Sequence, residues 1–470
     1  MASSNPSSIH TSSWGMSTFT YSMEIPQDTR KTLAIAWLGL GLLALLASGF
    51  FSILLVLSRT PQLQNLFPVA DFFRVALVVH VDLSVLVWFL AFGGSLWTLS
   101  GGNRWQSISW IAFWLTTIGT IVMCGAPFLQ VAKPIMANYV PVLDGPIFLT
   151  GLTLFGAGIG LLCFRSMAVA SSVGIHLKGD GALRFGLNTA MIATAVAGLV
   201  VVWSWARLPS DIDAHAYYEL LFWGGGHVLQ FGYVLLMLIT WIWLASTVGS
   251  GLAISPRILV ILFAVALVAV FLTPLTYLAY DVTTIENHHL QTQLMRYGGG
   301  LVIGPIALAV VISQWPMKVL SPELLPLRTS LLTSLLIFLV GGVIGFFIKG
   351  SDVRIPAHYH GCIVGVTLSM MGVTYLLLPK FGFNAPRSRA AAWQPAIYGG
   401  GQLLHILGLV WSGGYGVQRK VAGTEQILRS SQEFWGMGLM GIGGLIAIVG
   451  GILFLIIVSH SVITGYRAHL

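Results

Sequence analysis

Long apolar runs separated by short polar connections dominate the chain. A helix needs about 20 mostly apolar residues to cross the hydrocarbon core of a bilayer. Twelve segments meet this requirement, and most end at a proline, a glycine or a charged residue. The predicted spans are 33–57, 72–98, 107–129, 146–168, 184–205, 216–246, 256–280, 297–315, 329–349, 356–379, 394–413 and 433–459. The pattern therefore predicts an all-α fold, a polytopic membrane bundle of twelve transmembrane helices.

The composition agrees with a membrane protein. Of the 470 residues, 56% are hydrophobic and 8% are charged, whereas soluble domains carry about 25% charged residues. The cations are scattered singly between apolar runs, which excludes a nucleic-acid-binding protein. We expect a polar N-terminal segment, 1–32, followed by one transmembrane domain, 33–470. Residues 1–21 contain no cation followed by an apolar run, so we do not expect a cleaved signal peptide.

The distribution of cations predicts the orientation. Alternate connections, grouped with the termini, hold thirteen Lys and Arg, and the opposite side holds ten. The positive-inside rule then places both termini in the cytoplasm. We expect a multi-pass protein of a bacterial-type inner membrane.

The cysteines exclude several kinds of site. Cys124, Cys163 and Cys362 all lie in apolar stretches, and the sequence contains no CxxC or CxxCH. This chain therefore has no disulfide scaffold, zinc ribbon or covalently attached c-type haem.

Histidines in or beside the spans provide the candidate chemistry. His358 and His360 lie two apart in a predicted helix and point about 200° apart, so they cannot bind one metal but can reach planar cofactors on opposite sides. His288 and His289 lie at the far end of the seventh span, where we expect an irregular backbone that lets adjacent rings converge on one ion. His227 follows three glycines in WGGGHVLQF, which admit a bulky neighbour close to the backbone.

Six histidines fall at a similar depth in the outer half of the predicted bundle. A single histidine in a span is often a satisfied core residue, but intramembrane ionisable groups are costly and usually functional. Three neutral imidazoles suit a copper ion, and the remaining three suit two haems, one bound on both faces and one on a single face. The six are His80, His227, His288, His289, His358 and His360.

With this histidine pattern, the chain resembles the catalytic subunit of the haem–copper oxidase superfamily, that is, subunit I of cytochrome c oxidase. The family has a His in helix two, a His in helix six, HH after helix seven and HxH in helix ten, and all four features occur here in order. The resemblance covers all twelve spans and implies three sets of ligands. His80 and His360 would be the axial pair of a low-spin haem, His358 would bind a high-spin haem, and His227, His288 and His289 would hold the active-site copper.

The resemblance also implies a role for a pair of cations. Arg419 and Lys420 resemble the family's paired cations that contact haem propionates, although a solvated surface pair is the alternative. Copper is favoured over iron because the predicted donor set has three His and no carboxylate.

One departure from the family affects the expected reaction. Most oxidases of this superfamily have a Tyr four residues after the helix-six His, where it gives an electron and a proton as the O–O bond breaks. That position is Phe231 here, and Tyr233 is rotated by roughly 120° from the ligand face. The cbb3-type oxidases supply their tyrosine from helix seven, where this chain has Tyr277 and Tyr280. We expect reduction of O2 to water, with these two tyrosines as candidates.

Nitric oxide reductases of the same superfamily are the alternative. Joining two NO molecules into N2O needs no radical donor, which agrees with Phe231. The well-known members, however, bind iron with a Glu four residues after the His, and Gln230 is one residue away from that position.

Electrons must come from another chain, because a copper-A site or a c-type haem would need cysteine motifs that are absent here. We therefore expect a separate copper-A or c-type cytochrome subunit on the outer side. The family's helix-eight proton-channel Lys is missing, since Lys318 lies beyond Pro316, and Glu219 is a candidate for a functional carboxylate. A proton-coupled transporter is a remote alternative that does not explain the histidine pattern.

Overall fold

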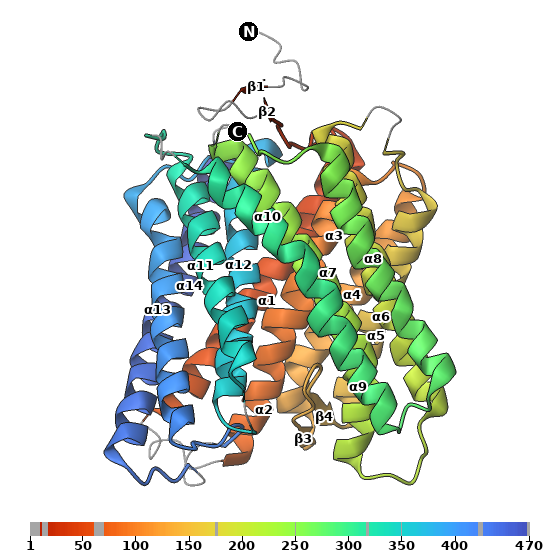
Figure 1. Cartoon of the computed structure of the whole chain (residues 1–470), viewed down its shortest axis with the longest axis vertical. Helices are drawn as coiled ribbons and strands as arrows, with labels where there is room; N and C mark the ends of the chain where they lie inside the picture. Colours follow the sequence, from red (N-terminus) through yellow and green to blue (C-terminus); the bar gives the residue numbers. More distant parts are fainter. Residues whose placement is uncertain are drawn as a thin grey trace. The chain divides into compact units, whose positions relative to one another are not determined.

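The computed structural model describes residues 10–11, 17–60, 70–173, 177–249, 251–315, 319–348, 350–421 and 426–467. The described part is a bundle of long helices (Figure 1). The helical segments, in chain order, are α1 (Thr29–Arg59), α2 (Ala70–Val81), η2 (Asp82–Val87), α3 (Trp88–Ser100), α4 (Gln106–Leu129), α5 (Pro146–Ala168), α6 (Gly179–Arg207), α7 (Ala214–Val248), α8 (Pro256–Ala279), α9 (Ile285–Gln293), η3 (Leu294–Gly299), α10 (Gly300–Ser313), α11 (Leu325–Phe346), α12 (Arg354–Phe381), α13 (Arg389–Gly414) and α14 (Ser431–Arg467).

The helices confirm the predicted polytopic bundle. Among the described residues, eleven helices are long and apolar enough to cross a bilayer. The twelfth predicted span corresponds to α13, which is 26 residues long and contains Arg389, Gln394 and His405. These polar side chains lower its hydropathy but leave it long enough to span.

Two of the twelve spans are interrupted by π-helical turns. The second span runs α2–η2–α3, and the eighth runs α9–η3–α10. The eighth span thus begins at Ile285, twelve residues before the start expected from the sequence. Its first part, IENHHLQTQ, is too polar for a hydropathy pattern to detect, and it forms a helix because Thr284 caps its N-terminus: the Thr284 hydroxyl accepts a hydrogen bond from the backbone N–H of Asn287, at 3.3 Å.

The chain divides into two compact units. The first contains Met1–Gly41, Phe89–Gly125 and Ala137–Leu320, and the second contains Leu42–Trp88, Ala126–Met136 and Ser321–Leu470. In the first unit α7 packs against α6 and α10, and in the second α11 packs against α12 and α13 against α14. The three predicted copper ligands belong to the first unit, and the three predicted haem ligands belong to the second.

Short strands occur in the polar connections. They are β1 (His10–Thr11), β2 (Ser17–Thr18), β3 (Lys133–Ile135) and β4 (Val142–Asp144), and β1 pairs antiparallel with β2. Part of the predicted N-terminal segment is folded onto the first unit, because Phe19 forms a bridge with Leu252 and the Tyr21 hydroxyl donates to the carbonyl of Ile254, at 2.5 Å.

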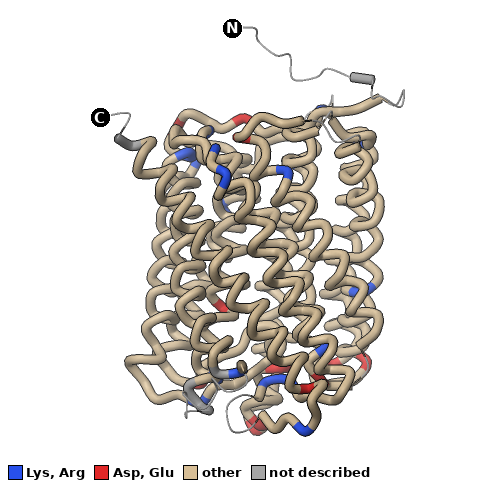
Figure 2. The backbone as a smooth tube through the Cα atoms, turned by 90° about the vertical axis from the view of Figure 1, so that its left-hand side faces the viewer, with Lys and Arg blue, Asp and Glu red and all other residues tan. Residues whose placement is uncertain are grey.

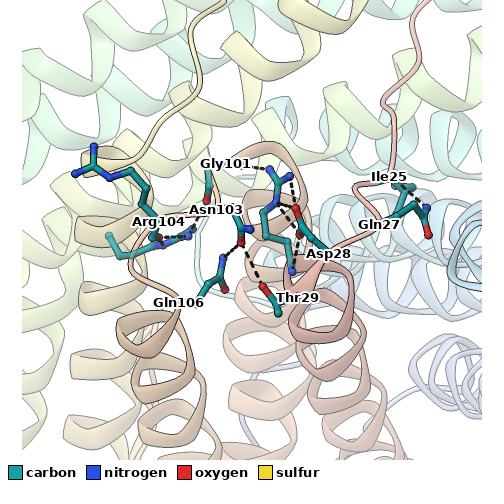
Figure 3. Close-up of polar contacts among 11 residues, drawn as sticks. Ile25, Gln27, Asp28, Thr29, Gly101, Asn103, Arg104 and Gln106 are labelled. Atoms are coloured by element: carbon teal, nitrogen blue, oxygen red, sulfur yellow. Dashed lines mark hydrogen bonds and ion pairs between the residues drawn. The ribbon is translucent and has the colours of Figure 1, made fainter.

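Polar contacts fix the start of α1 (Figure 3). Arg30 forms an ion pair with Asp28, at 2.7 Å, and its guanidinium also donates to the carbonyl of Gly101, at 2.5 Å. The Thr29 hydroxyl donates to the side-chain oxygen of Asn103, at 3.2 Å. Hydrogen bonding to the Arg30 side chain is the largest of the effects that hold the pKa of Asp28 below its usual value. These contacts explain why α1 begins four residues before the predicted apolar run.

Charged residues gather near the ends of the helices (Figure 2). A charge in the hydrocarbon core is costly, whereas a charge at the end of a span stays hydrated. The few ionisable groups within the spans are therefore candidates for functional residues.

Candidate metal centres

The glycines before His227 admit two tyrosines to the surface of α7. A Cβ at Gly226 would overlap the ring of Tyr139, and a Cβ at Gly224 would overlap the hydroxyl end of Tyr277. Asp213 caps the N-terminus of α7, and its carboxylate accepts hydrogen bonds from the backbone of the first turn. The prediction that these glycines admit bulky neighbours is confirmed.

Both ring nitrogens of His227 are hydrogen-bonded. The side chain is 2% exposed. Its Nδ1 lies 2.7 Å from the carbonyl oxygen of Trp223, and its Nε2 lies 2.9 Å from the hydroxyl oxygen of Tyr139. Because a carbonyl can only accept, Nδ1 carries the proton, and Nε2 accepts from the phenol. The neutral imidazole is thus held in one tautomer.

His288 and His289 lie on the regular helix α9. The expectation of an irregular backbone at these two residues was wrong, because the capped helix starts at Ile285. Adjacent residues on a helix point about 100° apart, so the two rings diverge. His288 stacks on Trp223, with ring centroids 4.6 Å apart, whereas His289 is exposed and its Nε2 lies 2.6 Å from Nε2 of Gln293.

The structure brings two of the three predicted copper ligands together. The rings of His227 and His288 both contact the indole of Trp223. The Nε2 atom of His288 is buried and has no hydrogen-bond partner among the described residues, which suits a metal ligand. His289 faces away, and no group of three His, Cys, Asp or Glu in the described parts of the chain is arranged around one ion. His289 joins the other two only if its side chain turns inward.

Glu219 lies at the edge of this group. Its carboxylate accepts hydrogen bonds from the backbone N–H of Asn138, at 3.0 Å, and from the side-chain amide of the same residue. It also interacts electrostatically with His288. Glu219 therefore connects the loop before β4 to the start of α7.

In the second unit, the predicted axial pair of the low-spin haem is brought together. His360 interacts electrostatically with His80 and with Arg59, and the side chain of Gln402 lies near its ring. The Nδ1 atom of His80 lies 3.0 Å from the carbonyl oxygen of Ser48 and 2.9 Å from its hydroxyl.

A further histidine, His405 of α13, lies beside this pair. Its ring centroid is 4.6 Å from that of His360, and its Nδ1 lies 3.0 Å from the carbonyl oxygen of Met440. His405 is not one of the six histidines predicted as ligands. Its position next to His360 became visible only in the structure.

His358 faces the opposite side of α12. Its Nδ1 lies 2.7 Å from the carbonyl oxygen of Gly341 on α11, and a Cβ at Gly345 would overlap its ring. The backbones of Gly341 and Gly361 also touch, so that α11 and α12 approach closely. With His358 toward α11 and His360 toward α13, the predicted divergence of the HxH pair is confirmed.

The residues of the second unit fit haem binding. In His80 and His358 a main-chain carbonyl accepts from Nδ1–H, which leaves Nε2 with its lone pair for a metal, as is usual for metal-binding histidines. The Nη2 atom of Arg59 is buried without a hydrogen-bond partner among the described residues, and this suits an anionic group such as a haem propionate. Both carboxylate oxygens of Asp82 are likewise buried without a partner in the described structure.

The two predicted tyrosines differ in burial and in the contacts of their hydroxyl groups. The Tyr277 hydroxyl is buried and lies 2.9 Å from the hydroxyl of Ser204. Tyr280 follows the last residue of α8 and is 42% exposed. Phe231 is buried, with its ring beside Gly298 and Gly299 of η3. The buried Tyr277 hydroxyl is thus hydrogen-bonded to Ser204 and not to a predicted ligand.

Arg419 and Lys420 lie in the connection after α13. Lys420 has a left-handed backbone (φ 62°), and its ammonium group donates to the carbonyl of Met136. The preceding Gln418 forms a bridge with Asp352, which is paired with Arg354 at 2.5 Å. Lys420 is thus part of a folded connection rather than a freely solvated cation.

The Asp352 carboxylate is the titratable group of this connection. Partial burial raises its pKa, but hydrogen bonds from the side chain and backbone of Arg354, together with its charge, outweigh burial and hold the pKa below its usual value. The ion pair is therefore formed at neutral pH.

Comparisons with known proteins agree with the histidine pattern. Residues 32–453 match the family model of cytochrome c and quinol oxidase polypeptide I. The chain therefore belongs to this family, which makes it a multi-pass membrane protein of the haem–copper oxidase superfamily and an oxidoreductase.

Individual relatives are distant or have no described activity. The chain is 30% identical to an uncharacterized protein of Rickettsia prowazekii (strain Madrid E), over 92% of this chain and 96% of that one. It is 28% identical to an uncharacterized protein of Aquifex aeolicus (strain VF5), over 74% and 85% of the two chains. The fold is similar to that of a heme-copper terminal oxidase dimer, with a TM-score of 0.71 at 15% identity, over 93% of this chain and 84% of that one.

Proposed function

We propose that this chain is the catalytic subunit of a respiratory terminal reductase that reduces dioxygen to water. Electrons would arrive from a copper-A or c-type cytochrome subunit on the outer side of a bacterial inner membrane, and both termini would face the cytoplasm. They would pass through a low-spin haem to a high-spin haem and a copper ion. The family supports a haem–copper oxidoreductase, and the choice of dioxygen is our proposal.

The observation that carries the proposal is the state of the histidine rings. His80, His227 and His358 each have Nδ1 within 3.0 Å of a main-chain carbonyl oxygen. The carbonyl accepts the proton on Nδ1, so each ring is oriented and can use its other nitrogen as a ligand. Metal-binding histidines usually donate their second ring N–H to a carbonyl or carboxylate in this way, and His405 makes the same contact with the carbonyl of Met440.

The proposed ligand sets follow the two units. His80 and His360 would hold the low-spin haem and His358 the high-spin haem, with Arg419, Lys420 and Arg59 as candidates for propionate contacts. When bound, the haems and copper supply the electrons for the reaction. The chain's residues orient these groups and keep the imidazoles neutral. Copper would be held by His227, His288 and, after an inward turn, His289.

Reduction of NO to N2O is the second candidate function. Phe231 favours it, because the buried ring at the helix-six position has no hydroxyl and cannot give a proton. The same position bears no Glu, and Gln230 is half-buried beside it. The two reactions must therefore be separated by experiment.

The test is a single-turnover assay on the purified, reduced complex with O2 and NO supplied separately, preceded by a pyridine–haem spectrum and copper analysis. We expect two haems, one copper and rapid consumption of O2. Rapid formation of N2O with slow reduction of O2 would overturn the proposal in favour of NO reduction. Absence of haem absorbance would overturn both and favour the transporter.

Ligand variants sharpen the assignment. His80→Ala and His360→Ala should each remove the low-spin spectrum, and His227→Ala and His288→Ala should lower copper content while both haems remain. His460→Ala on α14, an exposed histidine outside the predicted set, is the matched control and should leave metal and haem content unchanged.

A further inference from the structure

A tyrosine that the sequence analysis did not single out contacts the helix-six histidine. Tyr139 lies in the connection between α4 and α5, and its hydroxyl is 2.9 Å from Nε2 of His227. Its ring centroid lies 4.7 Å from that of His227 and 5.9 Å from that of Trp223. Among the described contacts of Tyr139, Tyr277 and Tyr280, this is the one that joins a phenol to a predicted metal ligand.

Two contacts fix the position of Tyr139, one through Gly226 of α7 and one through the neighbouring residue Asn138. Gly226 lacks the Cβ that would collide with Cβ, Cγ and Cδ1 of the tyrosine. The neighbouring Asn138 is held by two hydrogen bonds to the Glu219 carboxylate. The phenol is therefore fixed from the α7 side and from its own backbone, which leaves it little freedom to move away.

Tyr139 stays beside the metal ligand whichever nitrogen of His227 binds the ion. If the ion replaces the contact with the Trp223 carbonyl, the phenol remains hydrogen-bonded to the other nitrogen of the same ring. If the ion takes Nε2, it occupies the place toward which the phenol now points. In both cases Tyr139 would remain beside the ring of His227, whose centroid lies 4.7 Å from its own.

We propose that Tyr139 supplies one electron and one proton when the O–O bond of dioxygen breaks, a role for which the helix-six position offers only Phe231. This inference rests on the proposed function. Conversion of O2 to two H2O consumes four electrons and four protons. When bound, the haem and copper would supply three of these electrons. Tyr139 supplies the fourth together with its O–H proton, and its phenol becomes a neutral phenoxyl radical.

The phenol of Tyr139 is restored within the same catalytic cycle. One electron from the donor subunit and one proton from water return Tyr139 to the phenol, so the tyrosine is not consumed. A positioned group that transfers a proton in the transition state contributes about 100-fold or more to the rate. Tyr139→Phe should therefore slow O2 reduction by about 100-fold or more.

The test compares three variants of the holo-complex: Tyr139→Phe, Tyr277→Phe and Tyr233→Phe. Tyr233 is the matched control, because it is also buried on the first unit but packs edge-on against Phe89. Haem and copper content are measured first. The oxidised complexes, grown with ring-deuterated or ordinary tyrosine, are then treated with hydrogen peroxide and examined by electron paramagnetic resonance.

We expect a radical signal that narrows on ring deuteration, is kept in Tyr233→Phe and Tyr277→Phe, and is lost in Tyr139→Phe. A signal that persists in Tyr139→Phe, or that disappears in Tyr277→Phe instead, would overturn the inference while O2 reduction by the wild type still supports the proposed function. A wild type that forms N2O, leaves O2 unreduced and gives no radical would overturn both.

A second measurement applies if Tyr139→Phe does not assemble. Insertion of 3-fluorotyrosine at position 139 keeps the ring and the hydroxyl. The radical should then show a fluorine hyperfine splitting, and a spectrum without it would place the radical elsewhere.

Discussion

Gly226→Ala tests whether a missing side chain keeps Tyr139 against His227. The added methyl group would overlap Cβ, Cγ and Cδ1 of Tyr139. The Cβ atom cannot move away unless the backbone moves. Overpacking of this kind costs about 1–3 kcal/mol, and loss of the Tyr139–His227 hydrogen bond costs about 1 kcal/mol. Alanine recovers about 1 kcal/mol as a better helix former than glycine. The expected net loss of stability is therefore about 1–3 kcal/mol.

The assay is equilibrium unfolding in mixed micelles with increasing SDS, together with the copper content of the purified complex. Gly198→Ala is the control, because this glycine of α6 has nothing within 4 Å of an added Cβ. It should be neutral or slightly stabilising. The reasoning is refuted if Gly226→Ala unfolds with the same midpoint as Gly198→Ala and retains full copper.

Three further outcomes are expected. Gly341→Ala places a Cβ against the backbone of α12, the helix that carries His358. The high-spin haem spectrum should therefore be lost while the low-spin spectrum remains. An unchanged spectrum would contradict the close approach of α11 and α12. Thr284→Ala removes the N-cap of α9 at a cost of about 1 kcal/mol, and amide hydrogen exchange over 285–293 should become faster, with no change on α14. The pKa of Asp352 is lower in the folded state than the unfolded value of about 3.9, so its stabilising contribution is complete above that pH and is lost as pH falls through the folded pKa. Asp352→Asn should remove this part of the acid dependence of the unfolding midpoint. An identical pH dependence in the variant and the wild type would refute this prediction.

The sequence predicts the spans well because membrane helices are specified by local composition. Twelve apolar runs became twelve helical spans, and the HxH spacing gave the divergence of His358 and His360 from helix geometry alone. The start of the eighth span was missed for the same reason, since α9 is polar and is defined by its cap.

Contacts between distant parts of the chain were beyond the sequence. Tyr139 and His227 are 88 positions apart, and nothing in a loop tyrosine indicates which helix it meets. The one signal was the run of glycines before His227, which predicted a bulky neighbour without naming it. The buried Nη2 of Arg59 is similar, because an arginine at the end of an apolar run normally indicates a hydrated helix end.

The π-helical turn η3 makes the eighth span sensitive to the number of its residues. A π turn holds one more residue than an α-helical path would need, and such turns are frequent at functional sites. Deleting a single residue from Leu294–Gly299 would let the segment close into a continuous α-helix, turning α9 by about 100° about its axis relative to α10. His288 would then leave Trp223, although every residue of the site would still be present in the sequence. The position of His288 therefore depends on the length of this segment as well as on its composition.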